Sequence, residues 1–142
     1  EFLELPKVAD ILSRDFVSVK IDEDHMTGGK DIANALRAHA AQGGIPWFVF
    51  LDPSVRVLFR GPAPEEAPEG TLGPLLRRDE AVLATADGPE GNVGCPMTPP
   101  ERDWFLKSVH RARVTLTDDD MAALAAQLLT FARKEIGERA DG

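Results

Sequence analysis

The sequence predicts an α/β protein whose mixed sheet is flanked by helices, and three patterns support this fold class. The apolar run 47–51 is bounded by glycines and prolines, which is typical of a strand buried on both faces. Residues 16–22 alternate apolar and polar side chains, as a strand does, and the alanine-rich segment 30–41 between these runs has helical spacing. A strand–helix–strand unit followed by a hairpin with residues 55–59 makes a mixed sheet.

Pro46 stands directly before the apolar run. Proline has no amide hydrogen, so a sheet tolerates it at the first residue of a strand but not in the middle. The Ile45–Pro46 bond is also a candidate cis peptide, because bonds before proline lose most of the usual trans preference.

Four helices are predicted from side-chain spacing and start signals, at residues 6–12, 30–41, 98–111 and from 117 onward. Thr98 is the clearest start, since it can cap the helix while Glu101 completes a capping box. Thr117 opens the last helix in the same manner, with acidic side chains at the positive end of the helix dipole. The apolar stripe of this last helix is predicted to pack in the core, and it contains Met121, Leu124, Leu128 and Ile136.

By length, residues 1–142 form a single domain with a core of its own. A proline- and glycine-rich stretch at about 61–97 is too long for an ordinary connection. It is therefore either a functional loop or a packed insertion, and the leucines and valines within it favour an ordered lid over a flexible linker.

The composition excludes several classes of function. The formal net charge of -8 opposes binding to nucleic acid and to anionic membrane surfaces. No apolar run approaches the roughly 20 residues of a membrane span, so no membrane insertion is expected. The sequence also has no glycine-rich phosphate loop, no nucleophile elbow and no His-Glu-X-X-His motif.

The chain contains one cysteine, Cys95, so it cannot form an internal disulfide. Cys95 has no neighbouring base and no helix N-terminus directly after it, and a small buried filler is therefore favoured over a nucleophile. His25, His39 and His110 are too scattered for a metal site and are expected at the surface. We predict no metal and no cofactor.

Three segments, in this order along the chain, resemble motifs of a thioredoxin-like family. Phe16–Asp22 is similar to its Phe-Val-X-Val-Lys-X-Asp strand, and Gly44–Asp52 to its Gly-X-Pro-X-Phe-Val-Phe-Leu-Asp strand. Gly91–Pro96 is similar to its Gly-Asn-Ile-Gly-aromatic-Pro segment, with Cys95 in the place of the aromatic residue. The likeness covers nearly the whole chain and implies a thioredoxin-like fold.

The resemblance also implies a site that binds a protein or peptide. Gly44, Ile45 and Pro46 would hold an extended substrate, with Pro46 as the cis-proline that faces the redox site. Trp47 would be a platform for the substrate, although core packing is the alternative that we favour for a strand residue. A loop near the site would form one wall, unless it is merely a surface turn, and it contains Asn92, Gly94 and Cys95.

The departure from the family is the missing Cys-X-X-Cys. In its oxidoreductases this dithiol stands at the N-terminus of the first long helix, where the helix end lowers a thiol pKa. Alignment of the elements puts the dithiol, together with the first strand of the fold, before Glu1. Without that strand, the edges of the strands at 16–22 and 47–51 would be exposed. Either the intact protein has further residues before Glu1, which we favour, or another chain supplies the strand.

Two functional hypotheses follow. The chain is the larger part of a thiol-disulfide oxidoreductase, or it is a redox-inactive binding module or a subunit of an assembly. The sequence leaves open whether it is an enzyme, because no dithiol lies within it. The resemblance favours an extracytoplasmic, periplasmic location, and a single cysteine does not choose a compartment.

Overall fold

The computed structural model describes residues 2–22, 24–37, 47–54, 77–89 and 91–141. Within these ranges the chain is α/β, with five α-helices, one 3-10 helix and two small antiparallel sheets. In chain order the elements are η1 (Phe2–Glu4), α1 (Pro6–Ser13), α2 (Gly29–Arg37), β1 (Val49–Leu51), α4 (Arg78–Ala81), β2 (Val82–Thr85), β3 (Asp87–Gly88), β4 (Gly91–Asn92), α5 (Pro99–Ala112) and α6 (Asp118–Asp141).

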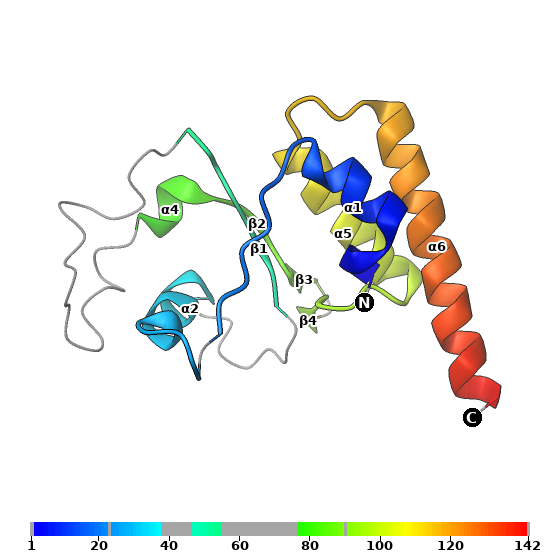
Figure 1. Ribbon diagram of the computed structural model, residues 1–142, viewed down its shortest axis with the longest axis horizontal. Helices are drawn as coiled ribbons and strands as arrows, with labels where there is room; N and C mark the ends of the chain where they lie inside the picture. Colours follow the sequence, from blue (N-terminus) through cyan, green and yellow to red (C-terminus); the bar gives the residue numbers. More distant parts are fainter. Residues whose placement is uncertain (1, 23, 38–46, 55–76, 90, 142) are drawn as a thin grey trace.

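The β1–β2 pair lies in the middle of the molecule, with α1, α5 and α6 on one side and α2 on the other (Figure 1). Helix α5 packs against both strands and against α6, and α6 in turn packs against α1. Strands β1 and β2 are antiparallel, with Val49 opposite Thr85 and an irregularity in register after Phe50. Strands β3 and β4 form a separate small hairpin.

The core lies between the three helices α1, α5 and α6, and η1 closes one end of it. Its buried members are Phe2, Val8, Ile11, Phe105, Val109, Leu116, Leu124 and Leu128. The helices at the two ends of the chain therefore share one core, whereas the middle of the chain contributes the sheet.

Contacts between phenylalanine rings join this core to the sheet. The ring of Phe105 on α5 lies 5.5 Å from that of Phe2 and 5.6 Å from that of Phe48. Phe48 lies 5.6 Å from Phe50 in β1, which lies 5.2 Å from Phe16. Each such edge-to-face pair contributes about 0.5–1.5 kcal/mol beyond the area it buries. Aromatic packing thus fixes β1 against α5.

The carboxylate of Asp15 ties the segment after α1 to the connection between α5 and α6. It accepts hydrogen bonds from the backbone N–H groups of Val114 (2.7 Å), Thr115 (2.8 Å) and Leu116 (2.9 Å), and from the Thr115 hydroxyl. Partial burial raises the pKa of Asp15, but the hydrogen bonds from Thr115 and from the backbone outweigh it and lower this pKa to about 2. We call this arrangement the Asp15 clamp.

The helix predictions are confirmed where the structure describes them. Helix α1 starts at Pro6, and α2 runs to Arg37 with Leu36 buried. The predicted continuation of α2 to Ala41 lies outside the described residues. Helix α5 begins with the predicted capping box, in which Thr98 Oγ1 accepts from the Glu101 N–H and Glu101 accepts from the Thr98 N–H.

Replacing Thr98 with alanine is expected to lower the free energy of unfolding by about 1 kcal/mol, because the backbone N–H of Glu101 loses the hydroxyl oxygen that accepts its hydrogen bond. Thr98→Ser keeps the hydroxyl and should stay within a few tenths of a kcal/mol of the wild type. Urea unfolding monitored by circular dichroism measures both. Equal midpoints for the alanine and serine variants would contradict the role of the cap.

Helix α6 starts at Asp118 as predicted, with Thr117 and Asp120 bonded reciprocally at its start. Leu124 and Leu128 are fully buried, which confirms the centre of the apolar stripe. The prediction for Ile136 is wrong, since this side chain is exposed. Figure 1 gives the reason, because α6 runs past the ends of α1 and α5 and the far part of its stripe meets no neighbouring helix.

The prediction of a strand at residues 16–22 is wrong for this structure. The segment forms neither a strand nor a helix, and Val17, Val19 and Ile21 are exposed. A strand requires a neighbouring strand that takes up its backbone hydrogen bonds, and among the described residues no strand pairs with this segment. The alternating pattern is present, but the pairing that it predicts is missing.

The strand predicted at residues 47–51 is confirmed over Val49–Leu51, which form β1. Its predicted burial on both faces is not confirmed. Val49 and Phe50 are half-buried and Leu51 is exposed. The partner of β1 is β2, which lies in the stretch that we predicted to be an insertion at 61–97. The later part of that stretch therefore belongs to the sheet, and all strand pairing among the described residues is antiparallel rather than mixed. The predicted hairpin partner at 55–59 lies outside the described residues.

Candidate functional site

The residue two positions before β1 contacts the β3–β4 hairpin through a side-chain hydrogen bond. The indole N–H of Trp47 donates to Asp87 Oδ1 at 3.1 Å. The other carboxylate oxygen of Asp87 accepts from the Thr85 hydroxyl at 3.3 Å, and Asp87 is paired with Asn92 in the hairpin. Trp47, Thr85, Asp87 and Asn92 together form what we call the Trp47 corner.

A second tryptophan supports this corner from α5. The indole N–H of Trp104 donates to the Thr85 carbonyl oxygen at 3.0 Å. A Cβ added to Gly88 would lie 3.0 Å from Val93 and 3.2 Å from the Trp104 ring, so the hairpin approaches α5 as closely as glycine allows. The hairpin is therefore fixed on the same helix that supports the sheet.

Trp47 is half-buried and faces a cation on one side. The guanidinium carbon of Arg37, the last residue of α2, lies 5.4 Å from the centroid of the Trp47 ring. A cation–π contact at a partly exposed site contributes about 0.5–1 kcal/mol. Trp47 is thus held by Asp87 through its N–H and by Arg37 at its ring, and it is neither a simple core residue nor a free surface side chain.

The structure brings together two of the sequence-predicted regions. Trp47, which follows Pro46, and Asn92, which belongs to the predicted loop near the site, both adjoin Asp87. Gly94 is half-buried in a bend just after the hairpin. The other predicted substrate-binding residues, Gly44, Ile45 and Pro46, lie outside the described residues, and so does the candidate cis bond.

The prediction for Cys95 is wrong, because its side chain is exposed rather than a buried filler. The bend from Gly94 onward turns the chain so that Val93 and Pro96 are buried and Cys95 between them faces solvent. The thiol is therefore accessible on the segment next to the Trp47 corner.

Because Cys95 is exposed, we expect a thiol reagent to modify it in the folded protein within about tenfold of the rate in denaturant. A Cys95→Ser variant, which leaves no thiol in the chain, is the control for reaction at other groups. Labelling that becomes fast only in denaturant would contradict the exposure of Cys95.

Sequence reasoning missed Thr85 and Asp87 in this corner, and Arg37 beside it. Asp87-Gly88 is a typical turn dipeptide, and a turn signal of this kind could have predicted the hairpin with Gly91. Gly91 has φ +109°, a conformation that favours glycine. The pairing of Asp87 with Trp47 spans 40 residues and has no local signal.

Two of the three histidines lie among the described residues, and both are exposed. His25 is exposed beside Asp22, whose Oδ2 lies 3.1 Å from its ring Nδ1, and His110 is exposed beside Arg113. The surface position is thus confirmed for these two, while His39 lies outside the described residues. Among the residues whose placement is described, no three His, Cys, Asp or Glu side chains are grouped so that they could hold a metal ion.

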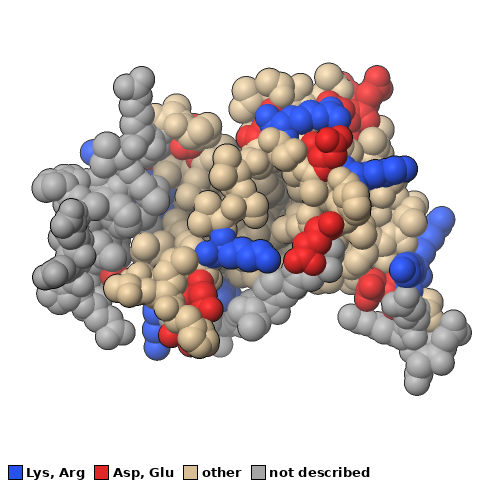
Figure 2. All heavy atoms as spheres, in the orientation of Figure 1, with Lys and Arg blue, Asp and Glu red and all other residues tan. Residues whose placement is uncertain are grey.

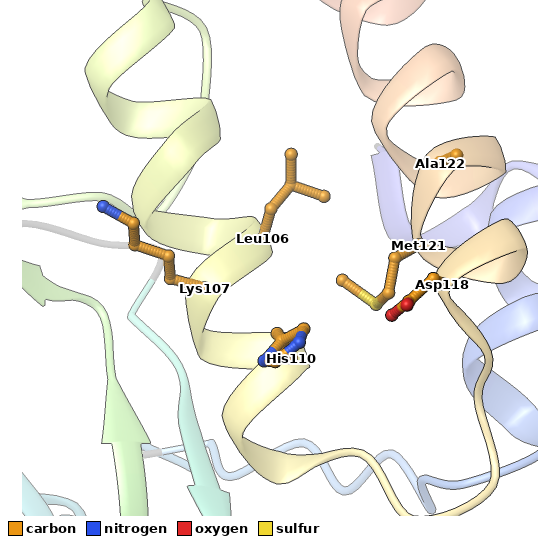
Figure 3. Close-up of a pocket in the computed structure, with 6 residues that line it drawn as sticks. All are labelled: Leu106, Lys107, His110, Asp118, Met121 and Ala122. Carbon is orange, nitrogen blue, oxygen red and sulfur yellow. The ribbon is translucent and has the colours of Figure 1, made fainter.

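A hollow of about 390 Å³ lies between α5 and α6, away from the Trp47 corner (Figure 3). Leu106 and Met121 point toward each other across it, and Ala122 lies beside them. Lys107, His110 and Asp118 stand at its rim, with Asp118 bonded to Arg113 at 2.9 Å. None of the sequence-predicted site residues lines this hollow.

Charges of both signs are interspersed over the face seen in Figure 2, without a continuous basic region. Of the helices in the described ranges, none is both long enough and apolar enough to cross a bilayer. Comparisons of the chain with protein-family models, curated proteins and solved structures give no match.

Proposed function

We propose that this chain is the larger part of a thioredoxin-like thiol-disulfide oxidoreductase, whose dithiol lies in residues that precede Glu1. The observation that supports the proposal is the Trp47 corner. There Trp47, which directly follows Ile45-Pro46 and precedes β1, is hydrogen-bonded to the hairpin that carries Asn92. These are the two motifs that the resemblance implies at one substrate site, although they are 45 residues apart in the sequence (47 to 92).

The proposed chemistry is thiol–disulfide exchange. A thiolate of the preceding dithiol attacks a disulfide of the substrate and forms a mixed disulfide, and one substrate sulfur leaves as a thiolate that takes up a proton. The second thiolate of the pair then attacks the mixed disulfide, which releases the other substrate thiol and leaves the dithiol oxidised. The role of this chain is to hold the substrate polypeptide in extended form at Gly44, Ile45 and Pro46, with Trp47 beside it. An extracytoplasmic location goes with this proposal.

The alternative function is a redox-inactive binding module, and one observation favours it. The chain contains a single thiol, Cys95, so it cannot by itself complete a dithiol exchange. In this alternative the same region near Trp47 binds a partner protein and no electrons are transferred.

Reduction of insulin disulfides by the intact natural protein, with dithiothreitol as the electron source, distinguishes the two functions. The oxidoreductase predicts a Cys-X-X-Cys before Glu1 and turnover that is lost when either cysteine is replaced. Absence of that motif from the intact protein would refute the oxidoreductase and leave the binding module.

Trp47 variants test whether the corner contacts the substrate. Trp47→Phe keeps an aromatic ring but loses the hydrogen bond to Asp87. Trp47→Ala loses both the ring and the hydrogen bond. A platform role predicts that KM for the insulin substrate rises about tenfold in the alanine variant and much less in the phenylalanine variant, since stacking on a ring contributes about 0.5–1.5 kcal/mol. Equal KM values in the wild type and the alanine variant would remove Trp47 from the site.

A further inference from the structure

The long helix α6 packs into the core with one side and carries a second pattern of side chains on another. Its core side contacts α5 and α1, and in Figure 1 the helix forms the edge of the molecule opposite to α2 and α4. The second pattern follows helical spacing along α6, and we call it the α6 outer row. Its exposed members are Asp118, Ala122, Ala126 and Arg133, and its half-buried members are Ala125 and Leu129.

The hollow between α5 and α6 opens beside the α6 outer row. Leu106 and Met121 point toward each other across it, and Ala122 of the row lines it as well (Figure 3). Alanines on a helix are explained by their high helix propensity alone. Helix propensity does not explain an apolar hollow of about 390 Å³ or the apolar side chain of Leu129 further along the row, where a solvated helix face usually carries polar side chains. The row thus holds a hole and a knob.

The apolar part of the α6 outer row is complementary to itself. Its midpoint falls between Ala125 and Ala126, and Ala122 and Leu129 lie at equal distances on either side. When two copies of α6 run antiparallel about a twofold axis at this midpoint, Leu129 of each copy faces Ala122 of the other. Leu129 then enters the hollow beside Ala122, and the small side chains at the axis let the two helices approach closely.

The charges at the ends of the row fit the same arrangement. Asp118 and Arg133 also lie at equal distances from the midpoint, so each Asp118 faces Arg133 of the other copy. The Asp118 side chain is 90% exposed although it pairs with Arg113, and it remains accessible to a second cation. A parallel pair would instead bring the acidic first turns of both helices together, each with three aspartates. The charges therefore select the antiparallel direction.

We propose that the α6 outer row is a self-association surface, through which two copies of the chain form a twofold dimer with antiparallel α6 helices. The occupant is a second copy because the row complements itself in size and in charge about one midpoint. The surface lies away from the Trp47 corner, so the proposal goes beyond the proposed function and does not depend on it.

Sedimentation equilibrium of the intact protein over a range of concentrations measures the association. Ala126→Glu places like charges close to the twofold axis and should raise the dissociation constant of the dimer about tenfold or more. Ala123→Glu is the matched control, because Ala123 is also an exposed alanine of α6 but lies outside the outer row, and it should leave the dissociation constant unchanged. A protein that stays monomeric up to about 1 mM would overturn the proposal. Equal dissociation constants for the two variants would overturn it as well.

Reversal of the terminal charges tests the antiparallel direction. Asp118→Arg and Arg133→Asp each place like charges at both ends of the dimer, so each variant alone should have a dissociation constant about tenfold higher or more. A mixture of the two variants restores both opposite-charge pairs in the mixed dimer, and its dissociation constant should return close to that of the wild type. Recovery on mixing also shows that both variants are folded. Failure of the mixed dimer to form would overturn the antiparallel arrangement.

Discussion

Replacement of Leu124 by alanine is expected to lower the free energy of unfolding by about 2–5 kcal/mol. Leu124 on α6 is fully buried and belongs to the core cluster that contains Phe2, Val8 and Phe105. Truncation removes apolar area from the core and leaves a cavity at a fully buried position. Urea unfolding, followed by circular dichroism at 222 nm, measures the change.

Leu3→Ala is the matched control for this prediction. The chemical change is the same, but Leu3 is 48% exposed, and its truncation should cost less than about 1 kcal/mol. Similar losses for the two variants would contradict the placement of Leu124 at the centre of the core.

The second large effect is expected at the Asp15 clamp. Asp15→Ala leaves three backbone N–H groups and the Thr115 hydroxyl without their acceptor. We expect a loss of about 1–2 kcal/mol, a value already reduced because solvent reaches this half-buried carboxylate. Asp10→Asn is the control, since Asp10 is exposed and pairs with Arg14 at 3.3 Å, and it should change stability by less than about 0.5 kcal/mol.

The clamp also predicts how stability depends on pH. The folded-state pKa of Asp15 is lowered from 3.8 to about 2, chiefly by the Thr115 hydroxyl and backbone N–H groups acting against partial burial. Above pH 3.8, the usual pKa of aspartate, the ionised carboxylate of Asp15 contributes its full stabilisation to the folded state. This contribution is lost as the pH falls from about 3.8 to about 2. The difference in stability between the wild type and Asp15→Asn should therefore shrink over this range. A difference that stays constant from pH 5 to pH 2 would show that the carboxylate charge is not involved.

Helices were predictable from the sequence because their signals are local. The capping residues Thr98 and Thr117 lie within four residues of the groups that they satisfy, and Pro6 marks the first turn of α1. The sheet was less predictable, because its pairing depends on distant segments. β1 was recognised as a strand, but its partner β2 was assigned to an insertion.

The candidate site was predictable only in part for the same reason. Trp47 and Asn92 were selected through motifs, and the structure links both to Asp87. The contribution of Asp87 requires a contact across 40 residues, and the exposure of Cys95 depends on the direction of a bend that the sequence does not specify.

The core that η1 and α1 share with α5 and α6 has a consequence for synthesis on the ribosome. Phe2, Val8 and Ile11 are made about a hundred residues before the side chains that cover them, from Phe105 to Leu128. At about 5–20 residues per second, translation takes roughly 5–20 s to produce those partners. During that interval the apolar face of the first helix has nothing to pack against. The nascent chain is therefore expected to fold late, after most of it has left the exit tunnel, and to depend on chaperones until then.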